Sequence, residues 1–145
     1  MKALFVVFAA LCSPITLKII SFAMIGAAIA LVDFAVFAFA SKVLEMPLVP
    51  SNVVAWLVAV SGSYVMNTLI TFRKESGRVL RREDYLKFVA SGILGVIAAT
   101  TTLVVLSYYV EVFVATLVSI LVSFAANFTM SHFVVFRPKV PIDGD

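Results

Sequence analysis

Four long apolar segments fill most of this 145-residue chain and constrain its fold more than any other feature. A hydrocarbon core of ~30 Å requires roughly 20 predominantly apolar residues per crossing helix. The composition agrees, because 63% of residues are hydrophobic, 13% are charged and the mean hydropathy is +1.13. We therefore predict an all-α membrane protein with four transmembrane helices. The predicted spans are Pro14–Ser41, Ser51–Phe72, Tyr85–Tyr109 and Val112–Phe136.

The residues between these spans leave no room for a soluble catalytic domain. The longest polar interruption, residues 73–84, is too short to fold alone, so we predict one integral membrane domain over residues 1–145. The single cysteine, Cys12, excludes an internal disulfide. We interpret Met1–Cys12 as an interfacial or partly embedded lead-in. A cleaved signal peptide is disfavoured because another apolar span follows at once.

The basic residues predict how the chain is oriented. Ten of the 11 Lys and Arg residues fall on one face of the predicted bundle, and Lys42 is the exception. The positive-inside rule makes that face cytoplasmic. We therefore expect both termini and the loop 73–84 in the cytoplasm, and a multi-pass protein of the cytoplasmic (inner) membrane.

Two similar hairpins are visible in the sequence. The first span contains Phe22-x-x-x-Gly26 and the third contains Phe88-x-x-x-Gly92, while the second and fourth both end in Phe-Arg, at Phe72-Arg73 and Phe136-Arg137. Two spans per copy insert in the same orientation, so we predict two tandem helical hairpins as a parallel internal repeat about an axis along the membrane normal.

Small and polar residues recur every fourth position in the second and fourth spans and so share one helix face. Helix packing explains such a stripe, since Ser, Thr or Asn hydrogen bonds across a helix contact contribute ~0.6 kcal/mol each. A groove that faces a substrate is the other interpretation. The stripes are Ala55, Ala59, Ser63, Asn67 and Thr71, and Ser119, Ser123, Asn127 and Ser131 with Thr116.

Asp33 lies in the body of the first span, ~22 Å along the helix axis from Lys18. A carboxylate there costs at least a few kcal/mol unless it faces protein, water or a cation, or takes up a proton. It therefore indicates proton coupling or recognition of sugar hydroxyls. The structural alternative is that Asp33 accepts hydrogen bonds from the Thr100–Thr102 run or from Ser61 and Ser63.

Basic and aromatic residues gather at the cytoplasmic ends of the spans. Guanidinium and ammonium groups at this level suit a phosphate, because Arg can contact two of its oxygens at once. They also suit simple topology anchors that reach the headgroups. His132 either hydrogen-bonds a phosphate or is an ordinary interfacial side chain. The candidate phosphate ligands are Arg73, Lys74, Arg137 and His132, with Lys18, Lys87 and Lys139 near the same level and Asn67 and Asn127 a turn or two above.

Enzyme motifs are absent from the sequence. It has no nucleophile–base pair with an orienting group, no metal-ligand spacing and no phosphate-binding loop. We expect no catalytic activity, no cofactor and no metal. Nucleic acid is not an expected partner, because the basic residues lie close to the membrane plane.

The ordered set of motifs resembles the GtrA-like family over about Lys18–Lys139. The motifs are Phe22-x-x-x-Gly26 with Asp33, Asn67 before Phe72-Arg73, Phe88-x-x-x-Gly92, and Asn127-Phe128 with Ser131-His132 before Val135-Phe136-Arg137. His132 departs from the arginine of many members. The resemblance implies a small four-helix inner-membrane protein of cell-surface polysaccharide synthesis.

Members of that family are thought to be flippases that move a polyprenyl-phosphate-linked monosaccharide across the membrane, or to assist the glycosyltransferases that make and use it. The resemblance thus implies that Arg73 and Arg137, with Lys74 and His132, bind the phosphate. Asp33, Asn67 and Asn127 would hold the sugar or relay a proton. The expected partners are the lipid-linked sugar and a membrane glycosyltransferase, and a homo-oligomer stays open.

Two other functions fit the same sequence. A proton-coupled small multidrug exporter also has four short helices with one acid in the first, although the strong charge bias here counts against it. A non-transporting subunit that positions a glycosyltransferase is the second alternative.

Overall fold

The computed structural model describes residues 13–138, and over this range it contains helices and no β-strand. Four helical segments are long and apolar enough to cross a membrane, and each lies within three residues of a predicted span. The prediction of an all-helical chain with four spans is therefore confirmed. The predicted lead-in Met1–Cys12 and Lys139 of the basic cluster lie outside the described residues. The four segments are Pro14–Lys42, Leu48–Thr71, Arg82–Ser107 and Val112–Val135.

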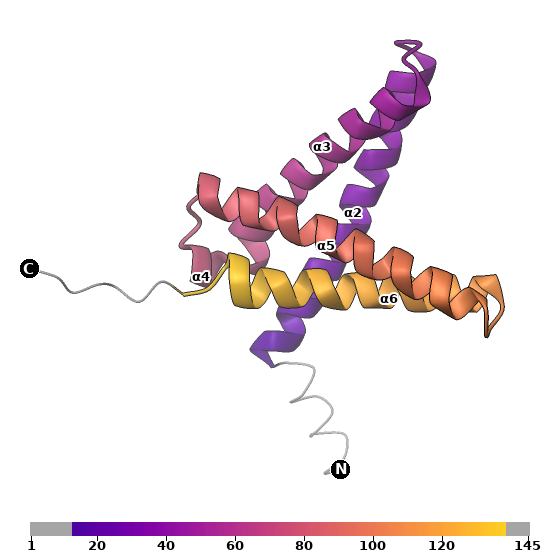
Figure 1. Cartoon of the computed structure of the whole chain (residues 1–145). Coiled ribbons are helices and arrows are strands. Elements are labelled where there is room, and N and C mark those ends of the chain that lie inside the picture. Colours follow the sequence, from indigo (N-terminus) through magenta and orange to yellow (C-terminus); the bar gives the residue numbers. More distant parts are fainter. Residues whose placement is uncertain (1–12, 139–145) are drawn as a thin grey trace, which may run out of the picture. The chain divides into compact units, whose positions relative to one another are not determined.

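The helices follow one another with short connections (Figure 1). Two of the long segments end in a π-helical turn, designated η1 and η2. The elements are α2 (Pro14–Lys42), α3 (Leu48–Met66), η1 (Asn67–Thr71), α4 (Arg73–Ser76), α5 (Arg82–Ser107), α6 (Val112–Met130) and η2 (Ser131–Val135).

A serine cap fixes the start of α2. Ser13 is the N-cap, and its side-chain oxygen accepts a hydrogen bond from the backbone N–H of Thr16 at 3.2 Å. Pro14 occupies the first helical position, where its missing N–H leaves no intrahelical bond unmade. The Ser-Pro sequence thus fixes this boundary locally.

Two helices begin one turn earlier than predicted. α3 starts at Leu48, and Pro50 is tolerated in its first turn because the N–H groups there have no intrahelical acceptor. α5 starts at Arg82, so three residues expected in the cytoplasmic loop form its first turn. Glu83 and Asp84 suit that place, because the positive end of the helix dipole attracts acidic side chains.

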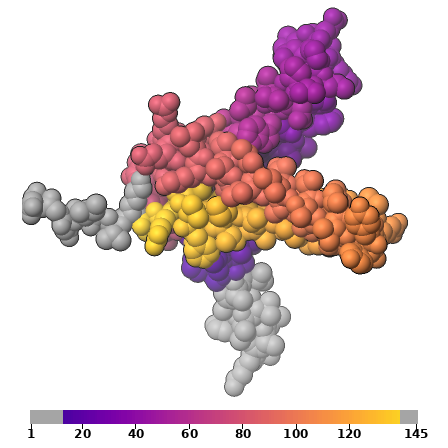
Figure 2. All heavy atoms as spheres, in the orientation of Figure 1, coloured from indigo at the N-terminus to yellow at the C-terminus, as the bar shows by residue number. Residues whose placement is uncertain are grey.

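The described residues form two units, divided after Arg73, and each unit is a helical hairpin. In the first, α2 packs against α3 and η1, and in the second, α5 packs against α6 and η2. The space-filling view shows that the α5 and α6 atoms adjoin along the second hairpin (Figure 2). Each hairpin is described separately below.

Both hairpins contain a π-helical turn at the corresponding place. The N–H of Phe72 donates to the carbonyl oxygen of Asn67 at 2.8 Å, and the N–H of Phe136 donates to that of Ser131 at 2.9 Å. Each bond spans five residues instead of the four of an α-helix. These turns were not predicted.

An aromatic pair joins the two helices of each hairpin. The ring centroids of Phe22 and Phe72 are 6.2 Å apart in an edge-to-face arrangement, and those of Phe88 and Phe136 are also 6.2 Å apart. All four rings are buried. The repeated Phe motifs of the sequence therefore close the hairpins by packing. Elsewhere, large apolar side chains such as Leu31, Val49 and Leu121 are exposed, as lipid-facing side chains would be.

Candidate functional site

The residues singled out in the sequence are divided between the two hairpins. Asp33, Asn67 and Arg73 belong to the first, whereas Lys74, Asn127, His132 and Arg137 belong to the second. Arg73 and Lys74 are exposed and directly follow the buried ring of Phe72.

The small-residue stripe in α3 is a packing surface. Ala55 and Ala59 are buried, and so is Ser51 one turn before them. In α6 the buried members at the corresponding places are Ala115 and Ser119. The hydroxyl of Ser119 donates to the carbonyl of Thr116 on its own helix at 2.8 Å. These positions support helix contact, which was one of the two interpretations of the stripes.

Asn67 begins η1 and is 1% exposed. Its Nδ2 donates to the carbonyl oxygen of Ser63 at 2.9 Å and reaches the Ser63 hydroxyl at 3.3 Å. Its Oδ1 is buried and accepts no hydrogen bond within residues 13–138. The amide nitrogen of Asn67 is therefore bonded within its own helix, whereas the amide oxygen is a buried acceptor without a partner there.

Asn127 lies on α6 against the backbone of α5. A Cβ built on Gly95 would stand 2.7 Å from Cγ and 2.8 Å from Nδ2 of Asn127, so a larger residue there would displace the Asn127 side chain. The Oδ1 of Asn127 is buried with no hydrogen-bond partner among the described residues. Gly95 thus makes room for a polar group inside the hairpin.

Asp33 is partly buried on α2, and it lies inside a membrane span, where a charged side chain is costly. Its Oδ1 is buried and accepts no hydrogen bond from any residue between 13 and 138. The hydroxyl of Ser61, one of the expected donors, instead donates to the carbonyl of Leu57 at 2.7 Å. Within the first hairpin, therefore, this oxygen has no hydrogen-bond donor, and the role of Asp33 stays a prediction.

His132 is part of an aromatic row on the second hairpin. Its ring stacks on Phe128 at 5.9 Å between centroids, and it meets Phe133 edge-on at 4.7 Å. These contacts fix the ring within η2 by packing.

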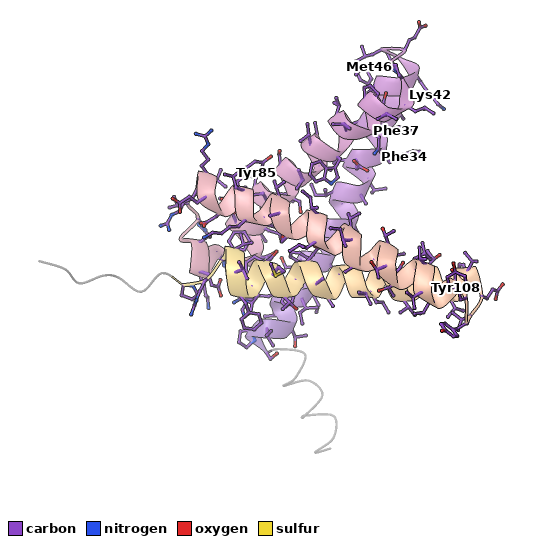
Figure 3. The ribbon with its side chains drawn as sticks, viewed as in Figure 1. Phe34, Phe37, Lys42, Met46, Tyr85 and Tyr108 are labelled. Carbon is purple, nitrogen blue, oxygen red and sulfur yellow. The ribbon has the colours of Figure 1, made fainter. Side chains whose placement is uncertain are left out.

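A cavity of about 400 Å³ lies at the end of the second hairpin where α5 begins. In Figure 3 the label Tyr85 marks this end of α5, and Tyr108 marks the opposite end. The π-helical turn η2 supplies a wall of the cavity, and α5 supplies two charged side chains. The lining residues are Asp84, Lys87, Phe133, Val134, Val135, Arg137 and Pro138.

The polar side of this cavity combines two cations with one acid. Lys87 and Arg137 are exposed, as required for groups that receive an anion from solution or from a headgroup. Asp84 is only 5% exposed, and its Oδ1 has no hydrogen-bond partner among residues 13–138. The apolar side chains from η2 complete a site suited to an anionic amphiphile.

Sequence reasoning included Arg137 and placed Lys87 nearby, but it assigned Asp84 to the cytoplasmic loop. A usable signal was present, since Asp84 lies one helical turn before Phe88 and so shares the buried face of that ring. No group of three or more His, Cys, Asp or Glu side chains that could hold a metal occurs within the described part of the chain.

Comparison with known families decides the family of this protein. The model of the GtrA/DPMS transmembrane domain matches residues 21–136. The chain belongs to this family. No curated protein and no solved structure matches it. The sequence resemblance to GtrA-like proteins is thereby confirmed.

Membership of the GtrA/DPMS family, together with the four apolar spans, makes the chain a multi-pass membrane protein. It also indicates involvement in glycan synthesis that uses polyprenyl-phosphate sugars. The matched segment contains both aromatic pairs and two of the three charged residues of the cavity, Asp84 and Lys87. Arg137 follows it directly.

Proposed function

We propose that this GtrA/DPMS-family protein flips a polyprenyl-phosphate-linked monosaccharide across the cytoplasmic membrane for cell-surface glycan synthesis. The observation that carries the proposal is the cavity at the start of α5, where Lys87 and Arg137 stand beside the apolar wall from η2. A lipid-linked sugar phosphate has matching parts, namely an anionic phosphate, a polar sugar and an isoprenoid chain. The protein itself makes and breaks no covalent bond in this proposal.

In the proposed path, the phosphate first binds at the cytoplasmic face, and the isoprenoid tail stays in lipid. Arg137 with Lys87, and Arg73 with Lys74, provide the cations, and the charge bias of the loops supports a cytoplasmic position for them. Further along the spans, Asn67, Asn127 and Asp33 are the proposed acceptors of hydrogen bonds from sugar hydroxyls, because each carries a buried oxygen without a partner among the described residues. His132, whose ring stacks on Phe128, is the remaining proposed phosphate ligand.

The parallel repeat gives this path its proposed form. Two hairpins inserted the same way round contain no inverted pair, so alternating access by rocking would need a second copy of the chain. A lateral groove along one chain has no such requirement. We therefore favour a groove in which the lipid tail remains outside the protein.

Vesicles reconstituted with the purified full-length protein test this function. Undecaprenyl phosphate glucose is incorporated, and a lectin added outside measures how fast inner-leaflet sugar becomes accessible. We expect the wild type to exchange the pool, and Arg137→Gln and Arg73→Gln to slow exchange about tenfold or more, as loss of a charge-assisted contact of at least ~1.4 kcal/mol would do. Arg78→Asn is the matched control, since Arg78 is an exposed loop cation with φ of 59°, a conformation that Asn tolerates.

The vesicle experiment and two companion measurements distinguish the proposed function from its alternatives. Unchanged rates in both arginine variants would remove the phosphate-site proposal. No exchange by the wild type, combined with copurification of a polyprenyl-phosphate glycosyltransferase, would favour the non-transporting subunit. Proton-dependent export of hydrophobic cations that is lost in Asp33→Asn would favour the multidrug exporter.

The orientation is tested separately by labelling with a membrane-impermeant maleimide. In a Cys12→Ser background, Ser76→Cys is expected to react only from the cytoplasmic side, and Tyr109→Cys only from the outside. Labelling of Ser76→Cys from outside, or of either variant from both sides, would overturn the proposed topology.

A further inference from the structure

Asp84 is the least expected group in the cavity of the second hairpin. An anion-binding site gains nothing from a carboxylate, because a phosphate held by Lys87 and Arg137 is repelled by a nearby acid. The position at the start of α5 accounts for a negative charge but not for its burial, since the helix dipole is also satisfied by exposed acids such as Glu83.

Burial makes this carboxylate costly unless a donor reaches it. Asp84 is 5% exposed, and its Oδ1 accepts no hydrogen bond from residues 13–138. A buried charged acceptor without a partner loses its hydration without compensation. Asp84 lines the cavity, so a ligand that brings a hydroxyl to its carboxylate offsets that penalty, whereas a bare phosphate does not.

We propose that Asp84 accepts a hydrogen bond from a hydroxyl of the sugar while Lys87 and Arg137 hold the phosphate, so that the second hairpin distinguishes the sugar-loaded carrier from bare polyprenyl phosphate. This inference rests on the proposed function for the class of lipid, but it concerns binding and not movement. The cavity of about 400 Å³ lies within the range of ~300–1,000 Å³ usual for small-molecule sites. Phe133, Val134 and Val135 provide the apolar wall for the first isoprene unit.

The first hairpin supports this assignment by contrast. Four residues before Phe22 it has Lys18, where the second hairpin has Asp84 four residues before Phe88. The Lys18 ammonium lies 6.0 Å from the Phe72 ring centroid, and Ser21 Oγ is hydrogen-bonded to Thr71 Oγ1 at 2.9 Å. These contacts join α2 to the end of the second span within the first hairpin. The hairpin framework therefore does not require an acid at the position that Asp84 occupies in the second hairpin.

Binding to the full-length protein in nanodiscs tests the inference without any transport step. The probes are undecaprenyl phosphate alone and the same lipid linked to glucose, mannose, galactose or N-acetylglucosamine. We expect the wild type to bind at least one loaded carrier about tenfold more tightly than the bare carrier, the size of one hydrogen bond to a charged group. Asp84→Asn should reduce this preference, because an amide oxygen accepts a weaker hydrogen bond than a carboxylate, and it should leave bare-carrier affinity equal or higher, because a repelling charge is removed.

The controls separate recognition from general damage. Glu83→Gln, an exposed acid in the same turn, is expected to change neither affinity. Lys87→Gln is expected to weaken the loaded and bare carriers together. For the wild type alone, a loaded carrier that lacks the recognised hydroxyl should bind as weakly as the bare carrier, and this arm remains decisive if Asp84→Asn fails to fold.

Several results would overturn the inference. One is equal affinity of the wild type for the bare carrier and all loaded carriers. Another is an equal loss of affinity for both kinds of carrier in Asp84→Asn. The third is unchanged affinity of the wild type when any single sugar hydroxyl is removed. Competition by glucose 1-phosphate as effective as that by the lipid would assign the cavity to a soluble sugar phosphate. Discrimination in nanodiscs without exchange in vesicles would sustain this inference and remove the flipping function, whereas exchange without discrimination would do the reverse.

Discussion

The two hairpins share one framework but differ in charge at the same point of that framework. Each has an aromatic pair at 6.2 Å and a π-helical turn just before a Phe-Arg sequence. One turn before the first Phe, the first hairpin has a lysine beside an aromatic ring, and the second has a buried aspartate in a cavity. The shared residues pack the two helices of each hairpin together, whereas the charged residue before the first Phe differs, and this is where we propose separate roles.

The aromatic pairs should give the largest effect and the same effect in both copies. Phe72→Ala and Phe136→Ala each remove a buried ring, and we expect a loss of about 2–3 kcal/mol. Lost van der Waals contact supplies most of this loss, because lipid is as apolar as the ring's surroundings. Thermal unfolding in detergent measures it. If one variant unfolded like the wild type, the shared framework would be disproved.

Exchanging the charges tests whether the hairpins differ in task. Asp84→Lys gives the second hairpin the residue of the first, and we expect it to reduce the preference for the loaded carrier about tenfold. Lys18→Asp makes the reverse change and should alter carrier binding less than about twofold, since Lys18 packs on Phe72 within its own hairpin. Equal effects of the two variants in the nanodisc binding assay would mean that the copies are functionally equivalent.

The glycines provide a smaller and sharper test within the second hairpin. Gly95→Ala would place a Cβ 2.7 Å from Cγ of Asn127, and displacement of that side chain should cost about 1 kcal/mol. Gly92→Ala meets nothing within 4 Å and should be neutral or stabilising by up to about 1 kcal/mol, because Ala favours helix. Melting temperatures in detergent distinguish the two, and similar values would place Asn127 elsewhere.

Asp33 should give the smallest effect on lipid exchange. Asp33→Asn keeps the shape and hydrogen-bonding oxygen but removes the charge, so we expect vesicle exchange to slow about threefold, or ~0.7 kcal/mol. A rate unchanged by the substitution would separate Asp33 from the sugar path.

The four helical spans could be predicted from the sequence, because span length is set by the bilayer and not by details of packing. The helix starts at Leu48 and Arg82 were missed because polar residues and proline are normal in a first turn, where hydropathy gives no signal. The π-helical turns left a trace that was not interpreted. The Phe of each Phe-Arg pair lies five residues after a polar residue, Asn67 or Ser131, and these are the pairs joined by the wider hydrogen bonds.

The candidate site was only partly predictable. Arg137 was found because a cation after an apolar span is conspicuous in a sequence. Asp84 was not found, since its burial depends on how α5 packs against α6 and η2, which sequence spacing alone does not specify.

Photocrosslinking at corresponding positions tests most directly whether the second hairpin holds the lipid-linked sugar phosphate. A benzoylphenylalanine replaces either Phe133 in η2 or Leu69 in η1, each three residues before the Phe of a Phe-Arg pair and each exposed. Tritiated undecaprenyl phosphate glucose is then crosslinked in membranes. The account predicts labelling from position 133 that bare undecaprenyl phosphate competes away only weakly, with little labelling from position 69. Equal labelling from both positions, or labelling from position 69 alone, would contradict it.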